Sequence, residues 1–284
     1  MTTARRLRIA TCRPLPEPDT DEPILGDALA AAGIAAELVA WDDPHADWDA
    51  PIPTVIRSTW NYVRDAAAFA AWVDRAAASA PLWNPPAVVR ANLYKRYLLA
   101  LAARGVAVVP TTLVERGAAI ALADDHPALA APRVVIKPEV GAGSSGARVF
   151  DAGDPEARAH LAALTAHGAA LVQPYVASVD DHGERSIIFI DGELTHAIRK
   201  SPRFAGGVER VTGPFAIDPA ERDLALAALA PHARDLLYGR VDMARDAHGR
   251  PMVMELELVE PSLFLGRSER ALARLVDAIA ARLA

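Results

Sequence analysis

The sequence predicts an α/β protein of two or three lobes, and three observations support this fold class. A chain of 284 residues can enclose more than one hydrophobic core. Strand-like and helix-like stretches alternate over residues 7–78, as they do in βαβ units. Residues 252–259 have the two-residue period of a strand: Met252, Met254, Leu256 and Leu258 alternate with Val253, Glu255, Glu257 and Val259, which are expected to share the other face.

Residues 1–88 are expected to form a first lobe around a small parallel sheet. The βαβ order favours parallel neighbours, because crossover connections join strands of the same direction. The third strand ends in Arg57, Ser58, Thr59 and Trp60, and the carboxyl ends of such strands face the ligand crevice. A Pro-Pro pair at 85–86 ends the lobe. The expected elements are strands 7–11, 36–41 and 54–58 and helices 22–32 and 65–78.

Residues 89–174 are expected to form a central lobe and residues 175–284 a C-terminal lobe, with a hinge at Pro174 and Tyr175. The central lobe should contain helix 92–104, strand 106–110, helix 117–122, strand 133–137, an extended pair at 149–150, helix 155–167 and strand 169–173. The C-terminal lobe should contain strands 185–191 and 193–200, loop 201–213, helix 219–237, strands 239–245 and 252–259, and helix 267–283.

The pair Glu255 and Glu257 is the most informative feature of the sequence. Carboxylates two residues apart on a strand point to one face and repel each other, and a divalent cation would remove that repulsion. A turn at 246–249 folds this strand back on strand 239–245, so Asp242 can meet both glutamates. Three hard oxygen ligands suit magnesium held jointly with nucleotide phosphates. The alternative is a solvated strand face that carries charge by chance.

A glycine-rich loop at 141–146 matches the dinucleotide pattern G-x-G-x-x-G after a strand. Residues 147–150 are too short and too strand-like for the helix that a dinucleotide fold needs. Strand, glycine loop and strand instead predict a flap over phosphates, with Ser144 and Ser145 as added donors and Lys137 on the incoming strand. The alternative is an ordinary loop with a surface lysine. No Gly-Lys-Ser/Thr occurs, so a nucleoside triphosphate would bind without a Walker sequence.

Composition narrows the class of partner. The formal net charge is −6 and no basic stretch is interleaved with aromatic residues, which argues against nucleic acid. The single cysteine, Cys12, excludes an intramolecular disulfide and a cysteine-based zinc site. No apolar run is long enough for a membrane span, and the N-terminus lacks an export signal. We therefore expect a cytoplasmic protein that acts on small molecules.

Eight short stretches, taken in order, resemble the ATP-grasp superfamily, in the branch of glutathione synthetase and the ribosomal-protein glutamate ligases. Each stretch is weak alone, but the ordered set is specific. They are residues 92–95, 135–138, 141–146, 171–176, 183–187, 198–200, 240–242 and 254–257. The resemblance implies an ATP-grasp fold in which the nucleotide lies between two α+β subdomains, with the βαβ lobe preceding them.

The resemblance also implies roles for individual positions, with ATP and two magnesium ions bound. Lys95 and Lys137 would contact the phosphates, and Glu184 would hold the ribose hydroxyls. The glycine flap would use Gly143, Ser144, Ser145 and Gly146; the adenine site would use Gln173, Tyr175 and Val176; the metal ligands would be Asp242, Glu255 and Glu257. Many relatives have Asn at the place of Glu257, but glutamate keeps an oxygen ligand.

The implied reaction begins when a substrate carboxylate attacks the γ-phosphorus of ATP, and an amine then displaces phosphate from the acylphosphate. Lys137, Arg199 and Lys200 are the expected catalytic residues, because the charge on the transferring group must be neutralised. Arg57, with Ser58, Thr59 and Trp60, is the candidate for substrate recognition, since an arginine fork suits a carboxylate. The alternative is that Arg57 pairs with an acid between the lobes.

Within the superfamily, residues 57–60, 199–200 and 255–261 are most similar to the cyclo-ligases of antibiotic biosynthesis that close O-ureido-serine into D-cycloserine. The implied function is an ATP- and magnesium-dependent ligase that forms a C–N bond between or within amino-acid-like molecules. The sequence does not determine the oligomeric state, and a homodimer is one alternative. Two alternatives are a kinase that stops at a phosphorylated product and a nucleotide-binding regulatory protein without chemistry.

Overall fold

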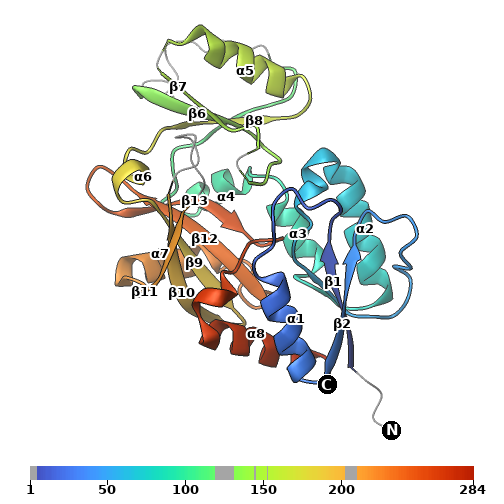
Figure 1. The fold of residues 1–284 in the computed structure, drawn as a ribbon. Helices are drawn as coiled ribbons and strands as arrows, with labels where there is room; N and C mark the ends of the chain where they lie inside the picture. Colours follow the sequence, from blue (N-terminus) through green and yellow to red (C-terminus); the bar gives the residue numbers. More distant parts are fainter. Residues whose placement is uncertain (1–4, 119–130, 144, 152, 202–209) are drawn as a thin grey trace.

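The computed structural model describes residues 5–118, 131–143, 145–151, 153–201 and 210–284 and arranges them around three separate sheets (Figure 1). The strand orders are β2-β1-β3-β4, β5-β8-β6-β7 and β11-β10-β9-β12-β13. The predicted α/β class with a leading βαβ unit is confirmed. One sheet falls within each of the ranges 1–88, 89–174 and 175–284.

The first sheet is parallel throughout, as predicted. Its strands are β1 (Arg5–Thr11), β2 (Ile34–Ala40), β3 (Thr54–Ile56) and β4 (Leu82–Trp83), and its helices are α1 (Glu22–Ala31), the 3-10 turn η1 (Trp60–Arg64) and α2 (Ala66–Ser79). β3 ends at Ile56 rather than at residue 58. The sequence pattern does not predict β4 or η1, because elements this short carry no measurable period.

The predicted helix 92–104 is wrong in its start and in its continuity. The chain forms α3 (Pro86–Asn92) and α4 (Tyr97–Ala103), with residues 93–96 between them. Pro86 begins α3, where its missing N–H costs no helical hydrogen bond. The break occurs where the Lys95 N–H donates to the Glu139 carbonyl at 3.0 Å, outside any helix. It places Lys95 beside the loop that follows β6.

The central sheet is antiparallel and contains the predicted strand, glycine loop and strand. Its elements are β5 (Thr112–Val114), β6 (Arg133–Pro138), β7 (Arg148–Asp151), α5 (Pro155–Thr165) and β8 (Ala170–Pro174), with α5 covering one face (Figure 1). The predicted strand 106–110 is wrong, because this segment forms an isolated bridge between Val108 and Val253. The predicted helix 117–122 runs outside the described residues.

The third sheet is antiparallel and carries the predicted acidic hairpin at its edge. Its elements are α6 (Ser178–Asp181), β9 (Glu184–Ile190), β10 (Glu193–Lys200), β11 (Val211–Phe215), α7 (Pro219–Leu229), β12 (Tyr238–Arg245), β13 (Pro251–Glu257), η4 (Leu265–Arg267) and α8 (Glu269–Arg282). The predicted helix 219–237 is too long. It ends at Leu229 because Pro231 cannot continue a helix and disfavours helical backbone in the residue before it.

A bulge in β13 corrects the predicted alternation. Asp242 pairs with Glu255 but Met243 pairs with Val253, so Met254 is an extra residue in the strand. We predicted that Val253 shares a face with the glutamates. Val253 instead lies in the same buried cluster as Leu256. The two-residue period therefore holds for Glu255 and Glu257 and fails on the other side of the bulge.

The first and third lobes share one hydrophobic core. Leu7 and Ile9 of β1 pack in the same buried cluster as Ile188 and Ile190 of β9, together with side chains of α1 and α8. The central sheet has its own small core under α5. In the described part of the chain no helix is both long and apolar enough to cross a membrane.

Candidate active site

One face of the β12–β13 hairpin gathers the three predicted metal ligands. Asp242 pairs with Glu255 across the ladder, and Glu257 lies opposite Arg240. Asp242 is buried, and both glutamates are half-buried. The repulsion expected among these carboxylates is relieved by four basic side chains that contact them, which are Lys95, Lys137, Lys200 and Arg240.

Glu255 lies between two lysines from outside its own sheet. Its Oε2 accepts a hydrogen bond from Lys95 Nζ, and its Oε1 accepts one from Lys137 Nζ, both at 2.8 Å. Because Lys137 belongs to β6, the central sheet faces the acidic side of the hairpin. Burial disfavours the charged carboxylate, but Lys137 and Lys95 outweigh it and hold the pKa of Glu255 well below its usual range.

Asp242 and Glu257 share a second basic pair. Asp242 accepts hydrogen bonds from Arg240 Nε and Lys200 Nζ, each at 2.9 Å, and Glu257 accepts one from Arg240 Nη2 at 2.6 Å. Burial opposes the charge of Asp242, yet Arg240 and Lys200 hold its pKa well below the usual range. Burial raises the pKa of Glu257, which Arg240 offsets only in part.

Glu184, the expected ribose contact, joins the same network. Its carboxylate pairs with Lys200, which bridges it to Asp242. Burial raises the pKa of Glu184 to about 7, because the opposing effect of Lys200 is partly cancelled by the negative charge of Asp242. The structure thus places Glu184 beside the acidic face with Lys200 as its partner, and its contact with a ribose stays a prediction.

The donor set suits a hard cation, although each carboxylate faces a basic side chain. Within the described ranges, no three His, Cys, Asp or Glu side chains are arranged so that they could hold a metal ion. Asp242, Glu255 and Glu257 nevertheless offer carboxylate oxygens from one side of one hairpin, and such oxygens are the ligands that magnesium prefers. The charge that a metal would neutralise is matched here by lysine and arginine. The carboxylate oxygens are of the kind that magnesium prefers, but in this arrangement basic side chains occupy them.

Around Glu257 the outer edge of β13 is held by side chains, whereas at Val253 it bonds to the backbone of residues 107–109. Asn92 Nδ2 donates to the Leu256 carbonyl, and the Leu258 N–H donates to Asn92 Oδ1, both at 2.7 Å. Asn84 Nδ2 donates to the Leu258 carbonyl at 2.7 Å, and the Leu256 N–H donates to the Tyr97 hydroxyl at 3.1 Å. Because these contacts flank residue 257, they fix which way the acidic face points.

The glycine loop follows Lys137 and lies against Pro138. Gly143 and Gly146 have φ of 58° and 73°, in the left-handed region that favours glycine. A Cβ on Gly146 would come within 3.2 Å of the Pro138 ring. The Ser145 N–H donates to the Ala142 carbonyl at 3.0 Å. Ser144, a predicted flap donor, lies outside the described residues.

The predicted adenine residues lie at the end of β8 and in the hinge behind it. Gln173 is buried, and its Nε2 donates to the Thr111 hydroxyl at 2.8 Å. The Tyr175 N–H donates to the Arg133 carbonyl at 2.9 Å, and the Arg133 guanidinium lies 3.9 Å from the Tyr175 ring centroid. Val176 follows directly. Residues 174–176 thus lie where the chain passes from the central sheet to the third sheet, and their role as a hinge stays a prediction.

The two expected catalytic residues at the end of β10 differ in position. Lys200 is buried in the acidic network described above. Arg199 is exposed, contacts none of the three metal-site carboxylates within the described ranges, and lies 5.8 Å from the Phe215 ring centroid on β11. The side chains of these neighbours therefore lie on opposite faces of β10, and Arg199 lies opposite Thr212 of β11 across the ladder.

Arg57 lies in the contact between the first and third lobes. Its side chain is 3 % exposed, its Nη2 is 3.4 Å from Asp21 Oδ2, and its guanidinium lies 5.2 Å from the Tyr238 ring centroid. Asp21 also accepts the backbone N–H groups of Leu263 and Leu265 at 2.6 and 2.7 Å. This is the arrangement of the alternative stated above, in which Arg57 pairs with an acid between lobes.

The neighbours of Arg57 are also placed by hydrogen bonds. Ser58 Oγ lies 2.9 Å from Thr11 Oγ1, and Thr59 is fully buried. Trp60 Nε1 donates to the backbone carbonyl of Glu260 at 3.0 Å. Trp60 therefore reaches the segment that continues from the acidic strand. Of the four predicted substrate residues, it is the one that the structure ties directly to this segment.

Two residues of the site, Arg240 and Glu260, have no individual function assigned from the sequence. Arg240 was visible only as part of the 240–242 stretch, because its position on the acidic face depends on the pairing of β12 with β13. Glu260 is buried beside Tyr62. It falls beyond the end of β13, so strand periodicity gives no signal for it.

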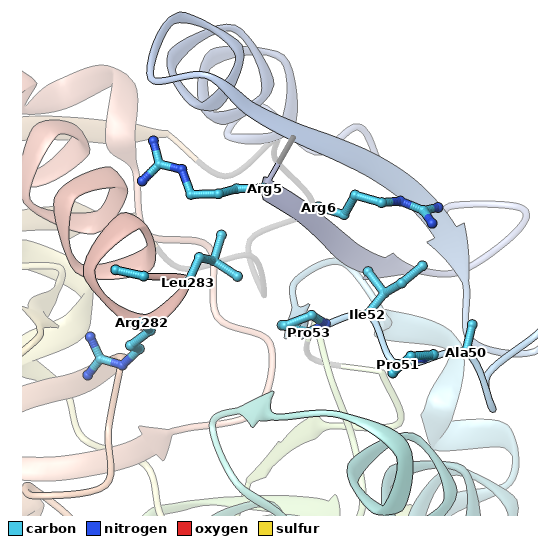
Figure 2. Close-up of a pocket in the computed structure, with 9 residues that line it drawn as sticks. Arg5, Arg6, Ala50, Pro51, Ile52, Pro53, Arg282 and Leu283 are labelled. Carbon is cyan, nitrogen blue, oxygen red and sulfur yellow. The ribbon is translucent and has the colours of Figure 1, made fainter. Parts of the chain in front are cut away.

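A surface hollow lies where β1 begins, at the end of the first sheet away from Arg57 (Figure 2). It is lined by the start of β1, residues 50–53 and the C-terminal residues of α8 and beyond. Its arginines already have partners, since Arg5 Nη2 donates to the Ala32 carbonyl at 2.8 Å and Arg282 Nη2 to Asp191 at 2.6 Å. The hollow shares no residue with the acidic site.

Comparisons with known proteins agree on one family. Residues 7–84 match the family model described as the N-terminal domain of the D-cycloserine synthetase DcsG. The chain is 40 % identical over 283 residues to the cycloserine biosynthesis protein DcsG of Streptomyces lavendulae, covering 93 % of this chain and 94 % of the relative. The crystal structure of D-cycloserine synthetase DcsG superposes with a TM-score of 0.87 at 36 % identity, covering 98 % of this chain and 100 % of that one.

More distant structures share the fold. D-alanine–D-alanine ligase from Bacillus anthracis, solved with ATP, has a TM-score of 0.69 at 15 % identity over 98 % of this chain and 97 % of that one. The ATP-grasp ligase PsnB, solved with a minimal precursor, Mg and ADP, has a TM-score of 0.66 at 19 % identity over 99 % and 98 % of the two chains. These two likenesses establish the ATP-grasp architecture.

Proposed function

We propose a reaction for this chain, which belongs to the D-cycloserine synthetase family of ATP-grasp ligases. It uses ATP and magnesium to activate a carboxylate-type group of an amino-acid-like substrate and then forms a C–N bond. We further propose that the bond closes a ring within one molecule, as in the formation of D-cycloserine. Identity of 40 % over 93 % of the chain supports this choice, and the family match at 7–84 includes the predicted substrate residues.

The observation that carries the proposal is the acidic face matched by basic side chains. Glu255 accepts hydrogen bonds from Lys95 and Lys137. Lys95 lies between α3 and α4, and Lys137 belongs to β6 of the central sheet. Such lysines can exchange a carboxylate for a phosphate, because both are anions that an ammonium binds as a point charge. We propose that Mg-ATP takes both lysines from Glu255, and that the freed carboxylate then binds metal.

The metal ligands in this proposal are Asp242, Glu255 and Glu257, holding two magnesium ions. Magnesium bridging the phosphates would neutralise the charge that develops on the transferring group. Arg240 and Lys200 now donate hydrogen bonds to Asp242. Once a metal is bound, they would keep the carboxylate oxygens that do not contact the metal oriented. The hydrogen bonds of Asn92 at the edge of β13 hold this face in place before any metal arrives.

The nucleotide would lie between the central and third sheets. The glycine flap, with Gly143, Ser144, Ser145 and Gly146, would cover the phosphates, because backbone N–H groups of a glycine loop can approach them closely. Gln173, Tyr175 and Val176 would line the adenine site at the hinge, and Glu184 would accept the ribose hydroxyls once Lys200 turns away.

The transfer itself needs positioning more than a covalent protein nucleophile. A substrate carboxylate oxygen attacks the γ-phosphorus and the bond to ADP breaks, which leaves an acylphosphate. A substrate nitrogen then attacks the acyl carbon, phosphate leaves and the nitrogen loses a proton. Lys137, Lys200 and Arg199 would neutralise the transferring group. Arg199, which is exposed near the end of β10, would help to exclude water from the acylphosphate.

The first lobe would supply substrate recognition through Trp60, Ser58 and Thr59. Trp60 is the strongest of these candidates because its indole contacts the segment after the metal strand. Arg57 would act from behind them. Two of its guanidinium nitrogens, Nε and Nη1, are buried without a hydrogen-bond partner in the described part of the chain.

The test is ADP release by the wild-type enzyme with ATP and magnesium over a panel of amino acids that includes O-ureido-serine. The proposal expects one substrate to raise ADP release well above background, and mass analysis to find a condensed or cyclised product. A stable phosphorylated product would assign a kinase instead. ATP binding without any substrate-dependent ADP release would reject ligase chemistry and favour a nucleotide-binding regulatory protein.

A further inference from the structure

We propose that Glu260 forms the subsite for the ammonium group of the substrate, an inference that rests on the proposed function. Glu260 follows β13 and is 9 % exposed. Its side chain lies beside Tyr62, and its backbone carbonyl accepts a hydrogen bond from Trp60 Nε1 at 3.0 Å. Both aromatic residues belong to the first lobe. Glu260 is therefore held where the first lobe meets the acidic face.

Glu260 differs from the other buried acids of the described chain. Each of the others has a cation or a backbone N–H as partner: Asp21 with Arg57, Glu139 with Arg96, Glu221 with Arg185, Asp242 with Arg240 and Lys200, and Asp19 with the Asp21 N–H. No lysine or arginine in the described ranges forms an ion pair with Glu260. A buried carboxylate without a cation is costly, so this site is completed when a ligand brings positive charge.

The charges that face Glu260 strengthen the argument. They are Glu257, Lys95 and Arg240. Lys95 is bonded to Glu255 and Arg240 to Asp242 and Glu257, so neither cation is available to it. Burial and Glu257 raise the pKa of Glu260 to about 8. An arriving ammonium would reverse that shift and gain a charged hydrogen bond.

The position of Glu260 also suits an amino-acid-like substrate. Such a molecule carries an ammonium close to the group that is activated. Glu260 lies three positions after Glu257 in sequence, so an ammonium held there stays next to the proposed metal site. The hydroxyl of the neighbouring Tyr62 is a second oxygen that can accept from an ammonium N–H. The chemical class recognised is therefore a primary amine beside a carboxylate-type group.

The experiment compares wild type and Glu260→Gln in steady-state ADP release, with O-ureido-serine and with its analogue lacking the amino group. Glutamine keeps the size and removes the charge. We expect Glu260→Gln to raise the KM for O-ureido-serine about 10- to 100-fold and to leave the KM for ATP unchanged. The analogue should be used equally poorly by both proteins. Glu221→Gln, at a buried acid paired with Arg185, is the matched control and should keep the wild-type KM.

Each other outcome is decisive. An unchanged KM for O-ureido-serine in Glu260→Gln would overturn the subsite while leaving the ligase function in place. If Glu260→Gln does not fold, the wild-type enzyme alone decides, because equal KM values for the substrate and the analogue would also overturn it. Failure of wild type to release ADP with any amino acid would reject the proposed function, and this inference with it.

Discussion

Replacement of Asn92 by alanine tests how the acidic face is positioned. Asn92 is buried and makes two hydrogen bonds of 2.7 Å to the backbone of Leu256 and Leu258, on either side of Glu257. Alanine leaves a buried C=O and a buried N–H without partners, at about 1–3 kcal/mol each. We expect the free energy of unfolding to fall by about 2–4 kcal/mol. For a chain of this size that is roughly 5–15 °C in the melting temperature.

The functional consequence separates positioning from stability. Because the two hydrogen bonds orient the strand that carries the proposed metal ligands, Asn92→Ala should raise the magnesium concentration that half-saturates ADP release by about 10-fold. Asn61→Ala is the matched control: Asn61 is buried in the first lobe and bonds to Trp41 and Asp42. It should lower the melting temperature without shifting the magnesium midpoint. A wild-type magnesium midpoint in Asn92→Ala would refute the positioning role.

Three further predictions follow from single contacts. Gly146→Ala should lower kcat/KM for ATP about 10-fold and should also lower the melting temperature by roughly 2–4 °C, since a Cβ there meets the Pro138 ring and φ is 73°; a wild-type kcat/KM for ATP would show that the loop does not cover phosphates. Arg57→Ala should lower the free energy of unfolding by about 3–5 kcal/mol in chemical denaturation, because it leaves Asp21 without its arginine. Unchanged stability with a raised KM for the substrate would instead show that Arg57 binds the substrate. The raised pKa of Glu260, about 8, means that the native state binds its proton more tightly than the unfolded state. Its contribution to stability is therefore present below about pH 4.5, is lost as pH rises to about 8, and stays constant above that. The stability of Glu260→Gln relative to wild type should accordingly increase between about pH 4.5 and 8 in urea titrations and level off at higher pH.

The sequence predicted most of the fold because long periodic elements and turn residues carry it. The βαβ order of the first lobe and the acidic hairpin follow from local patterns that tertiary contacts do not override. Errors occur where a distant partner decides. The predicted helix 92–104 is interrupted where the Lys95 N–H donates to the Glu139 carbonyl. The alternation in β13 changes at a bulge that arises from its pairing with β12.

The candidate site was predictable in its acids and lysines but not in their partners. Strand periodicity places Glu255 and Glu257 on one face, but it cannot tell that Lys95 and Lys137 turn onto Glu255. Those contacts join segments more than 100 residues apart. Glu260 escapes notice for a related reason, because its burial depends on Tyr62 from another lobe.

The central claim is that Asp242, Glu255 and Glu257 exchange basic side chains for magnesium when ATP binds. A crystal structure with a non-hydrolysable ATP analogue and magnesium tests it most directly. We predict metal density coordinated by oxygens of these three carboxylates, with Lys95 and Lys137 Nζ moved from Glu255 onto the phosphates. A structure in which both lysines stay on Glu255 and the metal binds the nucleotide without these carboxylates would contradict the account.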